Sequence, residues 1–327
     1  MLGLIMNRQL TITSLMEHAR KFHGEAEVVS VTADQPLHRY TYREAFARTA
    51  RLANALARFG MRPGERVGML AWNDYRHLEV YFATSSSGFV CHTINPRLFP
   101  EQIEYIVEHA EDRWLFVDPA FVPLLEALKH RLGCVEGFVI LGPAGAAANT
   151  TLRNAVDYET LIAGEPDTFD WPELDENSAC SMCYTSGTTG NPKGVVYSHR
   201  ALVLHTYGCL MPDVMNLSAR EVVMPVVPMF HVNAWGIPYG AAVVGAKLVF
   251  PGPRMGDGET LQRLIEGEGV TVTAGVPTVW LALLAHLNKT GKTVPSLRRV
   301  IVGGSACPPA IMEEFERRHG VHVHHAW

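Results

Sequence analysis

The sequence predicts an α/β fold of two stacked lobes, each built on a mostly parallel β-sheet with helices on its faces. Strand-like and helix-like patterns alternate along the chain, and most predicted strands are short apolar runs of the kind that parallel sheets bury. The chain has 327 residues, 47% of them hydrophobic, which is enough for about two structural units. We expect one lobe at about residues 65–200 and the other at 1–64 together with 201–327.

The first half of the chain gives the clearest helix signal. Thr41 and Glu44 form a capping box, and the apolar residues that follow repeat at helical spacing until Gly60. Strand and helix then alternate, which favours a sheet covered on both faces. We expect strands at 67–71, 91–95, 114–118 and 138–141, and helices at 101–109, 120–132 and from Asn73, as N-cap, to about Ser87.

Two stretches predict surface connections before the second half of the chain: residues 142–150 are rich in Gly, Ala and Pro, and residues 165–177 are polar. Residues 178–184 then predict a strand that leads into a glycine-rich segment. In open α/β sheets, ligands bind beyond the carboxyl ends of the strands, so this order places the glycines at a binding site. A second alternating series follows, with strands at 221–228, 247–250, 270–274, 299–302 and 321–325, and helices at 199–211, 258–268, 277–288 and 308–318.

Charge and hydropathy exclude several classes of protein. The net charge of −5 gives no basic surface, so nucleic-acid binding as the main activity is excluded. No run of about 18 uncharged apolar residues predicts a membrane span, and the start of the sequence lacks the pattern of a secretory signal. We therefore expect a cytoplasmic protein, while peripheral membrane contact stays open.

Two groups of potential metal ligands occur in the sequence. Cys180 and Cys183 form a C-x-x-C pair, and four histidines lie between His319 and His325. In strands, the three-residue spacing of the cysteines and the alternation of the histidines divide each group between two faces. We expect reduced, buried thiols and packed or solvated imidazoles rather than metal or redox sites.

The most informative segment is residues 184–194, which read Tyr-Thr-Ser-Gly-Thr-Thr-Gly-Asn-Pro-Lys-Gly. Its glycines let the backbone turn N–H groups toward an anion, and the hydroxyls and one ammonium group add donors. The spacing differs from that of the common P-loop, in which Lys is followed by Ser or Thr. The composition alone predicts a loop that holds phosphate groups.

This segment, with Val-Val-Tyr-Ser-His-Arg after it, resembles the AMP-binding signature of adenylate-forming enzymes, which include acyl-CoA synthetases, adenylation domains of peptide synthetases and luciferases. The resemblance covers nearly the whole chain and is closest to medium- and long-chain fatty-acyl-CoA synthetases. It implies the two-lobed N-terminal domain of such an enzyme. It also implies that ATP, Mg²⁺ and coenzyme A are used, with a fatty acid as the small-molecule substrate and a homodimer as one expected assembly.

Three further segments resemble motifs of the same family. Residues 227–236, with His231, Val232 and Trp235, resemble the motif that borders the acyl-adenylate. Residues 275–284 resemble the segment beside which the acyl tunnel runs. Residues 303–308 resemble the turn that packs on adenine and on the carboxylate end of the substrate, with contacts from Gly303, Ser305 and Ala306. Without the resemblance, His231 is an ordinary core histidine; Trp235 either fills core volume or closes the mouth of an acyl channel.

The resemblance assigns the glycine-rich segment to the triphosphate of ATP. Thr185 is also a candidate Mg²⁺ neighbour, and we expect catalytic roles for Thr185, Lys193 and His231. Lys193 either supplies positive charge or braces the loop. The β- and γ-phosphates are assigned to Thr185, Ser186, Gly187, Thr188, Thr189 and Gly190.

The printed sequence ends at Trp327, which matches the aromatic residue that stacks on adenine in the family. The residues that follow this aromatic in the family, and the small C-terminal domain with its catalytic lysine, do not appear here. We therefore expect a truncated N-terminal domain that is nearly inactive alone, since loss of one electrostatic group commonly costs about 10²-fold or more.

Other functions stay open at this point. An adenylating ligase for aryl acids, or one that loads an acyl-carrier protein, has the same loop. A non-catalytic module that binds nucleotide or acyl groups is an alternative from a different class.

Overall fold

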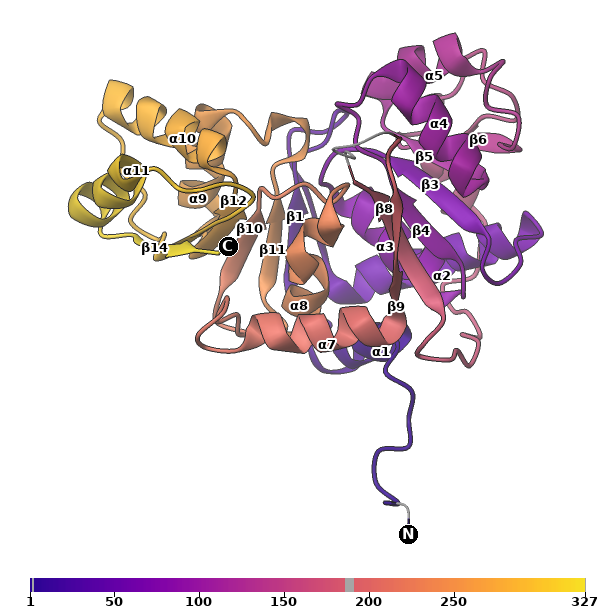
Figure 1. The fold of residues 1–327 in the computed structure, drawn as a ribbon, viewed down its shortest axis with the longest axis horizontal. Coiled ribbons are helices and arrows are strands. Elements are labelled where there is room, and N and C mark those ends of the chain that lie inside the picture. Colours follow the sequence, from indigo (N-terminus) through magenta and orange to yellow (C-terminus); the bar gives the residue numbers. More distant parts are fainter. Residues whose placement is uncertain (2, 186–190, 327) are drawn as a thin grey trace.

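Two seven-stranded β-sheets, separated and flanked by helices, form the protein (Figure 1). The computed structural model describes residues 1, 3–185 and 191–326. Every described strand pair is parallel except β1–β2 in one sheet and β8–β9 in the other. The structure confirms the predicted α/β fold with mostly parallel sheets.

We call the two sheets sheet A and sheet B. In sheet A the strand order is β14 (His322–His325), β13 (Arg299–Val302), β12 (Val272–Gly275), β10 (Val222–Pro225), β11 (Lys247–Phe250), β1 (Glu27–Ser30) and β2 (His38–Thr41). In sheet B it is β7 (Val156–Asp157), β6 (Gly137–Ile140), β5 (Asp112–Val117), β3 (Arg66–Leu70), β4 (Val90–Thr93), β8 (Ala179–Tyr184) and β9 (Gly194–Ser198).

A layer of helices lies between the sheets, and further helices cover their outer faces (Figure 1). The inner layer joins the sheets because α3 contacts β1 of sheet A as well as β4 and β8 of sheet B. Its helices are α1 (Ile12–Phe22), α2 (Tyr42–Arg58), α3 (Tyr75–Ser86) and α8 (Ile237–Val244), with α6 (Tyr158–Ala163) against α2 and α7 (His199–Leu210) against α8. The outer helices are α9 (Gly258–Glu268), α10 (Pro277–Thr290) and α11 (Pro309–Glu314) on sheet A, and α4 (Pro100–Ala110) and α5 (Val122–Leu128) on sheet B.

One apolar core is shared by the two sheets. Val67 and Met69 of sheet B belong to the same buried cluster as Val223 and Leu248 of sheet A, through the inner helices. Separate clusters lie under the outer helices on each side. Among the described residues, no helix is both long and apolar enough to cross a membrane.

The capping box at the start of α2 is confirmed, whereas the predicted cap of the next helix is wrong. The Thr41 hydroxyl accepts a hydrogen bond from the Glu44 backbone N–H, and the Glu44 carboxylate accepts one from the Thr41 N–H. Asp74, rather than Asn73, caps α3 by accepting from the His77 backbone N–H at 2.9 Å. The amide of Asn73 is engaged with sheet A instead, because it lies where the two sheets meet.

Other elements differ from the predictions in extent or were not predicted. The predicted helix at 308–318 is α-helical only over Pro309–Glu314, and residues Phe315–His319 form a π-helical turn. The predicted helix at 120–132 is also shorter, with a 3₁₀ turn before Val122–Leu128. The helices and strands that sequence patterns did not reveal are α1, α6, α8, β1, β2, β7 and β9.

A buried arginine ties the β1–β2 connection of sheet A to sheet B. Arg76 on α3 is 1% exposed and pairs with Asp34 at 2.9 Å and with Glu159 on α6 at 2.9 Å. Burial alone would raise the pKa of Asp34, but the Arg76 hydrogen bond and charge outweigh it and lower that pKa to about 2. Removing one partner of such a pair leaves an uncompensated buried charge, which is strongly destabilising.

Candidate active site

A cavity of about 310 Å³ lies where strands of both sheets end. The residues that line it follow the carboxyl ends of β4 and β8 in sheet B and of β10, β11 and β12 in sheet A. Strand ends converging on one hollow are the usual place for a ligand in α/β folds. The lining residues are Asn95, Arg97, Leu98, Tyr184, Val226, Pro228, Phe230, His231, Met255, Gly256, Val276 and Val279.

The glycine-rich segment begins at the edge of this cavity. Its residues 186–190 lie outside the described part of the chain, but the two ends of the segment are described. The Thr185 backbone N–H donates to the Lys193 carbonyl oxygen at 3.0 Å, and Tyr184 pairs with Gly194 across the antiparallel β8–β9 pair. The first and last residues of the segment are therefore held together by backbone hydrogen bonds.

Tyr184, at the base of this loop, is fixed by a neighbouring helix. Its hydroxyl is 2.6 Å from Nδ1 of His109 on α4, and its ring lies over Gly194, where a Cβ would be 3.2 Å from Tyr184 Cζ. Burial raises the pKa of Tyr184 to about 12. The side chain is therefore a neutral hydrogen-bonding group at physiological pH, and it faces the same cavity as His231.

On the sheet A side, the segment after β10 is held by Asn73. The Asn73 amide donates to the carbonyl oxygens of Pro225 and Val227 at 3.1 and 2.8 Å, and its oxygen accepts from the Met229 N–H at 2.7 Å. The Tyr81 hydroxyl donates to the Met229 carbonyl oxygen as well. These buried bonds fix the backbone just before His231, whose side chain lines the cavity; burial lowers the pKa of that imidazole and favours its neutral form.

The next residues adopt an unusual backbone. Val232, Asn233, Ala234 and Trp235 all have φ between 47° and 54°, and Gly236 follows at 74°. We call residues 232–236 the left-handed turn. Each non-glycine residue in this conformation costs about 1–2 kcal/mol, so such a run persists only where surrounding contacts impose it. Strained backbone of this kind concentrates at functional sites.

The side chains of the left-handed turn contact both sheets. The Asn233 side chain is 1% exposed and accepts a hydrogen bond at 2.9 Å from the hydroxyl of Ser181, in the strand that leads to the glycine-rich loop. The Trp235 indole lies against Gly303 at the end of β13, where a Cβ would be 2.7 Å from Trp235 Cη2. Only glycine fits at position 303, so this close approach joins two of the motifs predicted from the sequence.

Residues 15–327 match the model of the AMP-binding enzyme family.

The chain belongs to the AMP-binding enzyme family.

Individual relatives agree with this assignment. The chain is 51% identical over its whole length to a 3-methylmercaptopropionyl-CoA ligase of Ruegeria lacuscaerulensis and to a medium-chain-fatty-acid–CoA ligase of Ectopseudomonas oleovorans, and covers 60% of each. It is 48% identical to a long-chain-fatty-acid–CoA ligase of Thermus thermophilus, over 98% of this chain and 57% of that protein. The chain therefore spans about 60% of the length of these two CoA ligases.

Solved structures share the fold. An anthranilate CoA ligase, AuaEII, in complex with anthranoyl-AMP superposes with a TM-score of 0.84 at 23% identity, over 96% of this chain and 58% of that one. A long-chain-fatty-acid-CoA ligase of Archaeoglobus fulgidus gives a TM-score of 0.83 at 22% identity, over 96% and 63% of the two chains. These similarities confirm the fold of two stacked sheets.

Some of the residues expected at the site from the sequence lie together, and others do not. His231 lines the cavity. Thr185 meets Lys193, and Trp235 meets Gly303, but these four residues are not among those that line it. Val232 is at the surface, and Ser305 and Ala306 are exposed after β13 rather than in the cavity wall. The residues expected at the site that lie outside the described part of the chain are Ser186, Gly187, Thr188, Thr189, Gly190 and Trp327.

Sequence patterns missed several residues of the site. Asn95 and Arg97 line the cavity directly after β4, where the position at a strand end was the available signal. Asn73 and Ser181 act through contacts between the sheets, for which neither spacing nor composition gave a signal.

One member of each candidate group of metal ligands forms a hydrogen bond within the protein. The Cys180 thiol donates to the Tyr197 carbonyl oxygen, and burial raises its pKa, so it is a protonated, inert group. Nε2 of His325 accepts from the Cys307 N–H at 3.3 Å. Within residues 1, 3–185 and 191–326, no three histidine, cysteine or carboxylate side chains are grouped to hold a metal ion.

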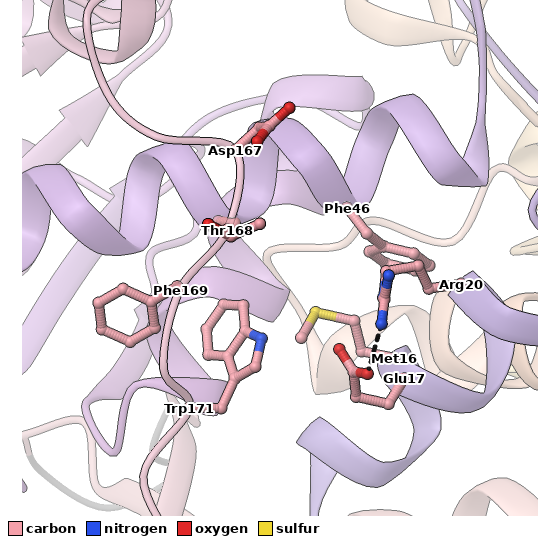
Figure 2. Close-up of a pocket in the computed structure, with 9 residues that line it drawn as sticks. Met16, Glu17, Arg20, Phe46, Asp167, Thr168, Phe169 and Trp171 are labelled. Carbon is pink, nitrogen blue, oxygen red and sulfur yellow. Dashed lines mark hydrogen bonds and ion pairs between the residues drawn. The ribbon is translucent and has the colours of Figure 1, made fainter.

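A second hollow, of about 190 Å³, lies between α1, α2 and residues 167–171 (Figure 2). Figure 2 shows the Trp171 indole beside Met16 and the Glu17–Arg20 ion pair, whose shortest distance is 3.0 Å. None of its lining residues follows the carboxyl end of a strand. We therefore place the active site in the cavity at the strand ends.

Proposed function

We propose that the protein is an acyl-CoA ligase. It activates a carboxylic acid with ATP to form acyl-AMP and pyrophosphate, and then transfers the acyl group to the thiol of coenzyme A with release of AMP. The observation that carries this proposal is the single cavity to which Tyr184, at the base of the glycine-rich loop, and His231, beside the left-handed turn, both contribute. CoA ligases at about half identity over the whole chain support it.

Different residues bind the phosphates, the adenine and the acyl group in this proposal. A carboxylate oxygen attacks the α-phosphorus of ATP, so the protein must hold two anions in line and neutralise their charge. Thr185, Lys193 and residues 186–190 bind the β- and γ-phosphates in this proposal. Ser305, Ala306 and Trp327 bound the adenine side, and His231, Val232 and Trp235 bound the acyl side. Gly303 contributes to both sides in this proposal.

Mg²⁺ fits this arrangement as a partner of the nucleotide. Thr185 offers a hydroxyl oxygen, the kind of ligand that Mg²⁺ prefers, and Mg²⁺ is commonly held by one or two protein groups together with substrate phosphates. When bound, Mg²⁺ neutralises phosphate charge; the protein's own donors orient the phosphates.

The acid is a medium- or long-chain fatty acid in this proposal. The cavity wall is mostly apolar, with Leu98, Val226, Phe230, Met255 and Val279 among its residues, which suits an alkyl chain. A shorter thioether acid is the second candidate, because a relative of equal identity is a 3-methylmercaptopropionyl-CoA ligase. Both substrates have an apolar tail and one carboxylate.

Pyrophosphate release by the full-length gene product with ATP and Mg²⁺ tests the proposal. The acids are octanoate, palmitate, 3-methylmercaptopropionate and benzoate, and thioester formation is followed after coenzyme A is added. We expect turnover with the aliphatic acids, and a loss of about 10²-fold in Gly190→Val, whose branched side chain restricts the phosphate loop. Gly164→Ala is the control, because a Cβ at Gly164 meets no atom within 4 Å.

Three results contradict the proposal or part of it. ATP binding without turnover of any acid identifies a binding module instead of a ligase. Turnover of benzoate alone identifies an aryl-acid enzyme. An undiminished rate in Gly190→Val shows that the glycine-rich loop does not hold the phosphates.

A further inference from the structure

The left-handed turn ends at a carbonyl group that a neighbouring helix holds. Nε2 of His205, on α7, lies 3.2 Å from the carbonyl oxygen of Trp235. Because a carbonyl oxygen can only accept, Nε2 carries the hydrogen of this bond. The thiol of Cys209, one helical turn further along α7, is 3.7 Å from the same oxygen and 3.3 Å from His205 Nε2. Two side chains of α7 therefore converge on the end of the turn.

The His205 ring also packs directly on the backbone of the turn. A Cβ at Gly236 would lie 2.9 Å from His205 Cδ2 and 3.2 Å from Nε2, closer than a real Cβ can come without displacing the ring. Gly236 itself has a φ of 74°, in the region that favours glycine. The glycine therefore serves two purposes: it allows the backbone conformation, and it lets the imidazole reach the preceding carbonyl.

His205 contacts the turn from α7, which contributes no residue to the cavity wall. Asn233 is bonded to Ser181 of sheet B, and the Trp235 indole lies on Gly303 of sheet A. His205 is exposed and lies outside the cavity wall, so it does not reach a ligand there itself. Its contact with the Trp235 carbonyl instead affects the orientation of Trp235, whose indole lies against Gly303.

We propose that His205 is a positioning residue for the acyl side of the site. Its hydrogen bond and its packing on Gly236 keep Trp235 in the left-handed conformation, which holds the indole on Gly303 and sets the fit of the acyl chain. This inference rests on the proposed function, because it assigns Trp235 to the acyl substrate. It concerns the acid and leaves the nucleotide side unchanged.

Kinetics of the full-length gene product test this role. His205→Leu keeps much of the volume and removes the donor; His205→Gln places an amide N–H near the position of Nε2. We expect His205→Leu to raise the KM for the preferred acid by roughly 3- to 10-fold, the effect of losing one hydrogen bond. The KM for ATP stays within twofold of the wild-type value, and His205→Gln restores most of the acid KM.

The control is Leu204→Ala, a change at an exposed neighbour on the same helix. A variant that only destabilises the fold lowers the active fraction and therefore kcat, without moving the KM for the acid. An unchanged acid KM in His205→Leu overturns the inference, and so does an equal rise in the KM for ATP. An inactive wild-type protein overturns the proposed function instead, so the two failures are distinguishable.

If His205→Leu does not fold, Gly236→Ala tests the same contact from the other side. The added methyl group displaces the imidazole, and we expect the same selective rise in the KM for the acid. A selective rise in the KM for ATP in this variant contradicts the inference.

Discussion

The cavity at the strand ends and the hollow between α1 and α2 differ in how their walls are built. The wall of the first includes a backbone segment held by the three bonds of the buried Asn73, and a left-handed turn follows that segment. The second is formed by the sides of two regular helices and one connecting segment, with an exposed ion pair at its edge (Figure 2). Both are concave, but only the first combines strain, buried polar contacts and close glycine packing.

This difference shows that strained backbone and buried polar contacts distinguish a functional site from an ordinary surface hollow. Strained conformations and buried hydrogen-bond partners are costly, and they persist where surrounding contacts enforce them. The second hollow requires no strained backbone or buried polar contacts, because it lies where two regular helices and a connecting segment meet. Substitutions in the two regions should therefore differ in their effects on activity and stability.

The largest expected effect is at Gly303. In Gly303→Val the new side chain collides with the Trp235 indole, since even a Cβ would be 2.7 Å from Cη2, and the acyl side of the site is displaced. We expect acid-dependent pyrophosphate release to fall by about 10²-fold, as misplacement of about 1 Å commonly causes. Gly164→Ala, directly after α6, is the matched control. An equal loss of pyrophosphate release in the two variants, or no loss in a folded Gly303→Val, contradicts the distinction between the two regions.

Two asparagines give the next test, because each one bonds three backbone groups. Asn73 is buried and bonds the segment after β10; Asn54 is partly exposed and donates to the carbonyls of Ala50, Pro166 and Thr168 near the second hollow. We expect Asn73→Ala to lower the free energy of unfolding by about 3 kcal/mol, and Asn54→Ala by about 1 kcal/mol because water replaces the amide. Urea unfolding measures both, and equal losses contradict the distinction.

A smaller effect is expected from pH at the contact between α1 and α7. Nδ1 of the buried His199 accepts from the Ile12 N–H at 3.2 Å, and burial lowers the pKa of His199 to about 4. In the unfolded chain the pKa of His199 is about 6.5, so between pH 6.5 and pH 4 the unfolded state binds more protons than the folded state. The free energy of unfolding therefore falls as the pH drops through this range, by at most about 1.4 kcal/mol per pH unit.

His199→Asn is the comparison for this measurement, because the Asn side-chain oxygen accepts the same bond and does not titrate in this range. We expect its unfolding free energy to depend less on pH than that of the wild type. Equal slopes for the two proteins between pH 7 and 5 show that His199 does not titrate on unfolding.

The smallest effect is expected at the rim of the second hollow. Glu17→Ala removes the ion pair between Glu17, whose side chain is 33% exposed, and Arg20, whose side chain is 53% exposed. Such pairs contribute about 0.5 kcal/mol or less, so thermal unfolding should barely change. A loss above about 1 kcal/mol in Glu17→Ala, or any selective change in the KM for the acid, shows that this hollow is more than a packing gap.

The sequence predicted the elements whose signals are local. The capping box of Thr41 and Glu44 and the strand that ends at Tyr184 follow from neighbouring residues, and the family motifs gave the order of the loop, the His231 segment and Gly303. Strands β1 and β2, by contrast, were not predicted. Each has four residues. β1 pairs with β11, a partner more than two hundred positions away, and β2 pairs with β1 at the edge of sheet A.

Local patterns by themselves thus determined the fold class, the phosphate-type loop and the family to which the chain belongs, because periodicity, capping and motif spacing are properties of adjacent residues. The tertiary structure decided that Asn73 holds the opposite sheet instead of capping α3, that residues 232–235 take left-handed backbone, and that His205 reaches the carbonyl of Trp235. These depend on contacts between segments distant in the chain, and the free energy of such contacts outweighs local preference.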